Sequence, residues 1–271
     1  MRLLPVTFLA LCVSCEPAMP QSSDDEFAGE GEGEGEGEDV DVGPLPVLPL
    51  WVLTHPSEGE ARISEVVTDE GFVRQSFEVP PAISSPHGLA VDSLRNRLLV
   101  IGFGDEDAAG LWTIDLDTGT AAPLNPRLQG SGVVVQDGRI FVVAEERFVE
   151  GENRFSFPLS LHEVDPVSGT IVTSREIHGM SCALDLAVIG EALVYTCDRH
   201  VVRFDEDAVE TVMERQLGTD NGENIYAATR FDDTRTLFVE AHGLSWVYDG
   251  GRAIAGRPIP MPGWITAVAV P

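Results

Sequence analysis

The chain has 271 residues, of which 43% are hydrophobic, and its formal net charge at pH 7 is −28. This composition is sufficient for a packed core, and the length allows one or two domains. Binding nucleic acid requires clustered cations that neutralise phosphates, so the charge argues against a nucleic-acid partner. All 17 basic residues are Arg, and without Lys the chain cannot carry out Schiff-base chemistry.

Residues 1–14 predict a signal peptide. Arg2 precedes a short apolar stretch that ends at Val13, and the small residue Ser14 follows it. A stretch of about eleven residues is too short to span a bilayer as a helix. We therefore expect an exported protein.

Cys15 is the predicted lipidation site. Residues 11–15, LCVSC, resemble the lipobox of bacterial lipoproteins, although Cys12 stands where these families usually have Leu. The resemblance implies a lipid anchor to a membrane in the cell envelope, with the outer membrane or cell surface favoured over the inner membrane. The alternative is an ordinary cleaved signal with an incidental Cys.

Residues 15–44 predict a disordered tether after the lipidated Cys. They hold eleven of the 45 acidic residues, and residues 29–38 alternate Gly with Glu. Such a segment buries nothing and repels itself, so it stays extended. The remaining 34 acidic residues and 16 Arg give the folded part a charge near −18.

Residues 45–271 predict one all-β domain with a repeat of about forty residues. The segments 111–120 (LWTIDLDTGT) and 161–170 (LHEVDPVSGT) share a strand that ends in Asp and a Gly-containing turn. Similar strands end at Asp205 and Asp249, and each is preceded by a hairpin. Every unit therefore predicts four strands in the order a, b, c and d, which is typical of a propeller blade.

The two ends of the domain complete this pattern. Residues 45–80 supply b, c and d strands, whereas residues 264–270 (WITAVAV) form a single a strand at the end of the chain. The C-terminal strand is thus expected to complete the first blade and close a ring of about five four-stranded blades.

Residues 88–100 and 111–119 together resemble repeats of the YVTN/NHL-like β-propellers. The resemblance implies a propeller fold and says little about function, because a fold supports many functions. A large sandwich of regular hairpins is the alternative architecture.

Three smaller features have structural interpretations. Asp115 and the residues after it favour a turn in which the Asp side chain bonds the backbone, because the later ligands of a calcium loop are missing. The four Trp lie on predicted strands and favour a role in blade packing over ligand contacts. Cys182 and Cys197 flank the a–b hairpin of the fourth blade, so an exported protein is expected to join them in a disulfide.

The strand directions predict a working face. Loops between blades share one side with the b–c loops, and five of the six His fall there: His55, His87, His178, His200 and His242. Residues just before an inner strand lie nearest the channel mouth. The expected ligand face is therefore His87, Ser181, Glu223, Asn224, His242 and Trp264, and the candidate metal ligands are His87, His178 and Glu223.

The expected function is a non-catalytic module that binds a protein, peptide or glycan. The alternative is a metal-dependent hydrolase or lyase, whose cofactor would be a divalent metal over the central channel. A purely structural role in the envelope is the third hypothesis. No Gly-x-Ser-x-Gly, His-Glu-x-x-His or dinucleotide fingerprint occurs to favour an enzyme.

Overall fold

The structure is a computed structural model of the whole chain. It describes residues 49–55, 60–67, 72–103, 110–145, 159–177, 185–189, 191–197, 200–204, 209–214, 225–230, 235–240, 245–249, 252–255 and 264–270. Within these ranges the chain forms β-strands and one short 3-10 helix, η1 (Ser93–Arg95).

The strands form five four-stranded antiparallel sheets. The first contains β20 (Trp264–Ala269), β1 (Pro49–His55), β2 (Arg62–Val67) and β3 (Phe72–Glu78). The second contains β4 (Ser85–Asp92), β5 (Arg97–Phe103), β6 (Leu111–Asp115) and β7 (Ala121–Asn125). The third contains β8 (Gly132–Gln136), β9 (Arg139–Glu145), β10 (Leu159–Val164) and β11 (Ile171–Ile177).

The last two sheets follow the same order along the chain. The fourth contains β12 (Asp185–Ile189), β13 (Ala192–Cys197), β14 (His200–Phe204) and β15 (Val209–Glu214). The fifth contains β16 (Ile225–Arg230), β17 (Arg235–Glu240), β18 (Ser245–Asp249) and β19 (Arg252–Ala255).

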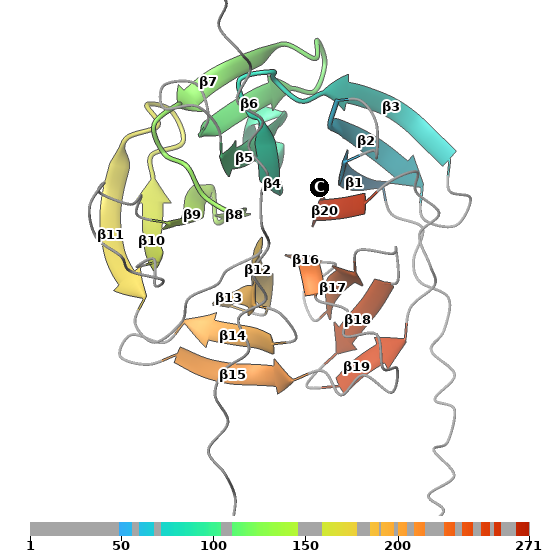
Figure 1. Cartoon of the computed structure of the whole chain (residues 1–271), viewed down its shortest axis with the longest axis vertical. Coiled ribbons are helices and arrows are strands. Elements are labelled where there is room, and N and C mark those ends of the chain that lie inside the picture. The colour runs from blue at the N-terminus through green and yellow to red at the C-terminus, as the bar shows by residue number, and fades with distance from the viewer. Residues whose placement is uncertain are drawn as a thin grey trace, which may run out of the picture. The chain divides into compact units, whose positions relative to one another are not determined.

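The five sheets surround a common centre (Figure 1). The inner strands β20, β4, β8, β12 and β16 lie nearest that centre, and each packs beside the inner strands of its two neighbouring sheets. The prediction of an all-β propeller built from four-stranded sheets is confirmed.

The first sheet combines the two ends of the folded part. β20 pairs antiparallel with β1, and Trp51 lies opposite Ala269. The Thr266 hydroxyl also donates to the carbonyl oxygen of Leu53, 213 residues earlier in the sequence, at 3.4 Å.

The hydrophobic core lies between neighbouring sheets. β5 reads RLLVIGF, and its five central residues are all buried because neighbouring sheets cover both faces of this strand. One core cluster, around Leu98 and Trp51, joins the first two sheets, and another, around Ile140 and Leu99, joins the second and third. Within the first sheet, the aromatic ring of Trp51 stacks on that of Phe77, with 5.6 Å between the ring centres. This contact is in line with the predicted role of Trp51 in blade packing.

The predicted Asp turn after β6 is confirmed, and it recurs after β10. Asp115 Oδ1 accepts hydrogen bonds from the backbone N–H of Thr118 and from its hydroxyl, both at 2.8 Å. Asp165 Oδ1 accepts the same pair from Ser168, at 2.7 and 2.8 Å. These bonds lower the pKa of both carboxyl groups, because they stabilise the ionised form.

Candidate functional site

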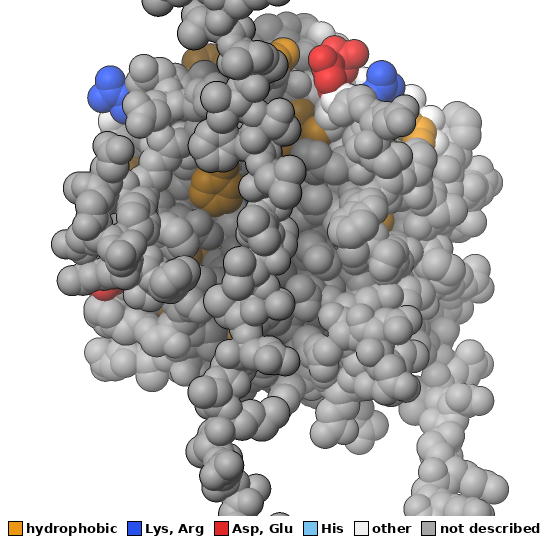
Figure 2. Space-filling view, in the orientation of Figure 1, with side chains coloured by type: hydrophobic (Ala, Val, Ile, Leu, Met, Phe, Trp, Pro, Cys, Tyr) orange, Lys and Arg blue, Asp and Glu red, His pale blue; other side chains and the backbone are white. Residues whose placement is uncertain are grey.

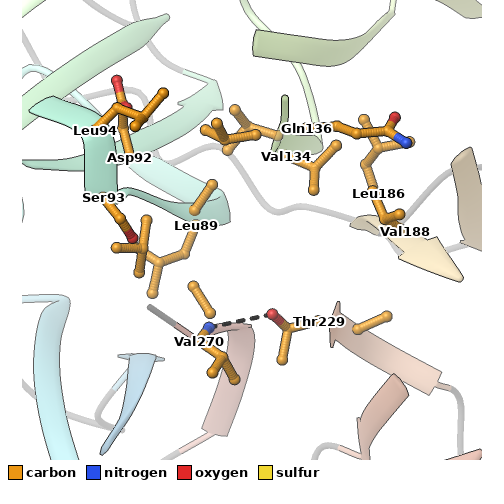
Figure 3. A pocket seen from close by; sticks show the side chains of 16 residues that line it. Leu89, Asp92, Ser93, Leu94, Val134, Gln136, Leu186, Val188, Thr229 and Val270 are labelled. Atoms are coloured by element: carbon orange, nitrogen blue, oxygen red, sulfur yellow. Dashed lines mark hydrogen bonds between the residues drawn. The ribbon is translucent and has the colours of Figure 1, made fainter. Parts of the chain in front are cut away.

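A cavity of about 370 Å³ lies at the centre of the ring (Figure 3). All five inner strands contribute to its wall, mostly with their C-terminal parts, and η1 contributes to its rim. The lining comprises residues 89–94, 133–136, 186, 188, 228, 229, 269 and 270. Because each inner strand is the terminal strand of its sheet, its second backbone edge has no partner strand among the described residues.

Most of the lining is apolar. Leu89, Leu186 and Val188 are buried in the wall, while Val134 is half-buried (Figure 3). Leu94 lies at the rim with 78% of its surface exposed, which is unusual for a leucine beside a cavity. The site thus offers apolar contacts both inside the cavity and at its mouth.

Two polar side chains of the wall make hydrogen bonds within the protein. The Gln136 side-chain N–H donates to the carbonyl oxygen of Glu191 at 3.0 Å. The Thr229 hydroxyl accepts from the backbone N–H of Val270 at 3.2 Å, which joins β16 to the end of β20 (Figure 3). These groups hold the wall in place.

Asp92 is the acidic group of the described lining, and two Arg offset its charge. Its carboxylate is fully buried and accepts from Arg97 Nε at 2.9 Å and from Arg95 Nη1 at 3.2 Å. Arg97 Nη2 also donates to the carbonyl oxygen of Pro166 at 2.5 Å, in the turn after β10. The described wall therefore presents no uncompensated negative charge, although the protein as a whole is strongly acidic.

Asp185 is the first residue of β12, and its side chain connects this strand to β16. It is buried, and its carboxylate oxygens accept from the backbone N–H groups of Leu186 and Ala228, both at 2.9 Å. Its own N–H donates to the Thr196 hydroxyl at 3.1 Å. Burial raises the pKa of the Asp185 carboxyl well above its usual value, because removal from water penalises the charged form more than the two N–H donors favour it.

A second cleft, of about 500 Å³, lies between the third and fourth sheets. Two Arg side chains in its wall lie over aromatic rings. The Cζ atom of Arg139 is 5.2 Å from the ring centre of Phe141, and the Cζ atom of Arg175 is 5.9 Å from that of Phe204. Glu163 pairs with Arg139 at 3.7 Å. Arg139 therefore makes its contacts within the third sheet, whereas Arg175 on β11 reaches across to Phe204 on β14 and links the third sheet to the fourth.

Hydrophobic side chains are visible toward the middle of the face shown in Figure 2, and charged side chains are visible at its upper edge.

His87 lies at the start of β4, at the other end of the strand from the cavity. Its Nε2 lies 3.0 Å from the Ser85 hydroxyl, and its ring meets that of Phe103 edge-on at 5.3 Å. The register of β4 shifts between Pro86 and Gly88, so a bulge sets the position of His87. His87 does not belong to the cavity lining.

The other predicted site residues are less fully described. Trp264 begins β20 opposite His55, and Cys197 ends β13 opposite His200. The structure describes the backbone of these residues and not their side chains. Cys15, His178, Ser181, Cys182, Glu223, Asn224 and His242 lie outside the described residues. The lipidation, the disulfide, the ligand face and the metal ligands therefore stay predictions.

The described residues contain neither a metal-binding cluster nor a membrane-spanning helix. No three His, Cys, Asp or Glu in the described ranges come close enough together to hold a metal ion. In the same part of the chain, no helix has the length and apolar character needed to cross a membrane.

Sequence reasoning missed the cavity at the C-terminal parts of the inner strands. A signal was present in the sequence. The segments 88–92 (GLAVD) and 132–136 (GVVVQ) each begin with a Gly that is followed by three apolar residues. Gly88 and Gly132 allow inner strands to approach closely, since a Cβ on Gly88 would lie 2.9 Å from the Val133 nitrogen. The same residues are compatible with an ordinary buried strand, so the pattern alone does not reveal a cavity.

The fold and the cavity define a β-propeller with a central site. No family model and no curated protein matches the sequence. Among solved structures, the chain is similar to the acylaminoacyl peptidase of Pyrococcus horikoshii, at 11% identity and a TM-score of 0.43, over 78% of this chain and 40% of that one. It is also similar to the Pan2 WD40 domain of Neurospora crassa, at 14% identity and a TM-score of 0.43, over 81% of this chain and 65% of that one.

The chain thus spans about two fifths of the peptidase chain and slightly less than two thirds of the Pan2 chain. Likenesses at these identities and TM-scores carry no argument about activity.

Proposed function

We propose that this protein is a lipid-anchored, non-catalytic binding module of the cell envelope that holds a short peptide segment of a partner protein in its central cavity. The observation that carries the proposal is the 370 Å³ cavity, whose wall combines apolar side chains with backbone edges of five inner strands. Ligand sites in proteins are typically concave, mostly apolar and of this size.

A peptide suits this wall better than a glycan. The half-buried wall residues Val134 and Val270 offer contacts for an apolar side chain, whereas sugar hydroxyls need polar partners. The backbone edges of the inner strands can exchange hydrogen bonds with a peptide backbone, as extended peptides do at sheet edges, except through the N–H groups of Leu186, Ala228 and Val270, which already donate within the protein. The exposed Leu94 adds an apolar contact at the rim.

The peptide site is tested by filling the cavity. Val134→Phe adds volume to a half-buried wall position, so we expect it to weaken the binding of capped tetrapeptides that contain Leu or Val by about tenfold or more. Val73→Phe is the matched control, because it makes the same change on the outer strand β3, far from the lining. Ligand-observed NMR identifies binding peptides, and calorimetry measures their affinity. Equal affinities for both variants, or no binding peptide, would contradict the proposal.

The anchor is supported by the signal-like residues 1–14 and by the lipobox-like sequence before Cys15. A single acyl chain binds membranes only marginally, and stable anchoring takes a second chain or another attachment. We expect Cys15→Ser to move the protein from the membrane fraction of a bacterial host to the soluble fraction, as measured by detergent partition. Ser22→Thr, beyond the lipobox-like segment, is a control that keeps both the signal and the Cys. A membrane-bound Cys15→Ser protein would show that the anchor lies elsewhere.

A further inference from the structure

The third sheet presents exposed hydrophobic residues at its outer side. Val167, in the turn before β11, is 79% exposed, and Ile171 and Val172, at the start of β11, are 45% and 58% exposed. These are three of the five large hydrophobic residues that are exposed in the described part of the chain. Exposed residues of this kind mark interaction sites when they gather on one element.

β11 also has an open backbone edge. It pairs with β10 on one side and is the last strand of its sheet, so within the described residues no strand pairs with its other edge. Proteins usually protect such an edge with proline, charge or a short strand. β11 has seven residues and no proline, and residues 171–174 carry no charge.

Other outer strands show the usual protection. β7 has five residues and contains Pro123, which cannot donate to a further strand. β3 has seven residues but carries Arg74, which pairs with Glu65 on β2 at 3.5 Å. The first half of β11 is therefore the least protected outer edge among these three strands.

The start of β11 is held rigidly. The Asp165 turn fixes the chain just before it, and Asn125 Nδ2 donates to the carbonyl oxygen of Gly169 at 2.9 Å, which ties the turn to the second sheet. Arg97 makes a further bond to Pro166 in the same turn. A pre-ordered edge loses little entropy when another strand is added to it.

Charge decides between two occupants of this edge. A second copy would bring together two folded parts that each carry a charge near −18, as the acidic residues and Arg from residue 45 onward give. Such repulsion disfavours self-association, whereas a basic partner is attracted and steered by the same field. We propose that residues 171–174 of β11 bind an extended strand of a partner protein, with β-branched residues at alternate positions and basic residues beside them.

The probe for this edge is a labelled peptide, acetyl-Arg-Val-Thr-Val-Thr-Val-Arg-amide, added to the full chain. Fluorescence anisotropy measures its affinity, and hydrogen exchange locates it. We expect slower exchange in residues 171–177 on binding. A peptide N-methylated at alternate residues cannot donate those hydrogen bonds, so its affinity is expected to fall by about tenfold or more.

Val172→Lys places a charge on the edge and is also expected to weaken binding by about tenfold or more. Val73→Lys on β3 is the matched control and should bind like the unchanged protein, as should the cavity variant Val134→Phe, which separates this surface from the proposed peptide site. Circular dichroism verifies that each variant folds.

The proposal is overturned if the N-methylated peptide or Val172→Lys binds as well as the reference, or if no binding occurs at about 1 mM peptide. Sedimentation at several concentrations tests the other occupant. A dimer that Val172→Lys abolishes would assign the edge to a second copy and would equally overturn the proposal.

Discussion

Gly132→Ala is expected to destabilise the folded domain by about 1–3 kcal/mol, because the added methyl group enters a contact between two inner strands. A Cβ on Gly132 would lie 2.5 Å from the Leu186 nitrogen, 2.8 Å from the Leu186 Cβ and 2.9 Å from the Asp185 carbonyl carbon. Two of these three atoms belong to the backbone, so no side-chain rotation can make room. β8 and β12 would have to move apart, which would also disturb the cavity wall.

Urea denaturation of both proteins measures this difference as a lower transition midpoint at an unchanged slope. Gly88→Ala should act in the same direction, since its Cβ would meet β8. Ala122→Val is the control, because it enlarges an exposed residue of the outer strand β7. An unfolding free energy equal to that of the unchanged protein would show that the inner strands are less closely packed at Gly132.

The repeat made the fold predictable from the sequence. Local signals set each hairpin, and the Asp turn at residues 115–119 could be derived from its side-chain chemistry alone. The missing a strand before β1 and the extra strand at residues 264–269 indicated which segments share a sheet. Both signals depend on regular spacing, which a single sequence displays directly.

The centre of the ring was not predictable in the same way, because it depends on contacts between units. Where β8 meets β12, Gly132 packs against the β12 backbone. Where β12 meets β16, the contact is made by the side chain of Asp185. The repeat predicts a strand at each place and does not say how closely the strands approach. The His pattern has a related limit, since the side chain of His87 contacts Ser85 and Phe103 within its own sheet.

Asp185 should contribute to stability in a way that depends on pH. Asp185→Ala removes the acceptor of the Ala228 N–H in a buried place, so we expect a loss of about 1–3 kcal/mol in the free energy of unfolding. Asp185→Asn keeps the shape and one acceptor oxygen but does not titrate. Asn also loses one of the two acceptor oxygens, but this loss is the same at every pH, so the pH dependence of the difference between this variant and the unchanged protein isolates the effect of the carboxyl proton.

The sign follows from the raised pKa of Asp185. The folded protein holds this proton more tightly than the unfolded chain does, so the resulting stability is fully present below the unfolded pKa of about 3.9. It is lost as the pH rises through the folded pKa. The unfolding free energy of the unchanged protein minus that of Asp185→Asn should therefore decrease from acid toward neutral pH, by at most about 1.4 kcal/mol per pH unit.

Asp115→Asn provides a control of opposite sign. The hydrogen bonds from Thr118 lower the pKa of Asp115, so its contribution is present above the unfolded pKa of about 3.9 and is lost as the pH falls through the folded pKa. The corresponding difference for Asp115→Asn should therefore increase with pH below about pH 3.9, whereas that for Asp185→Asn should decrease with pH above about pH 3.9. Urea titrations at several pH values measure both slopes. Slopes of the same sign would mean that the Asp185 carboxyl is better solvated, or better paired as an anion, than its position between β12 and β16 implies.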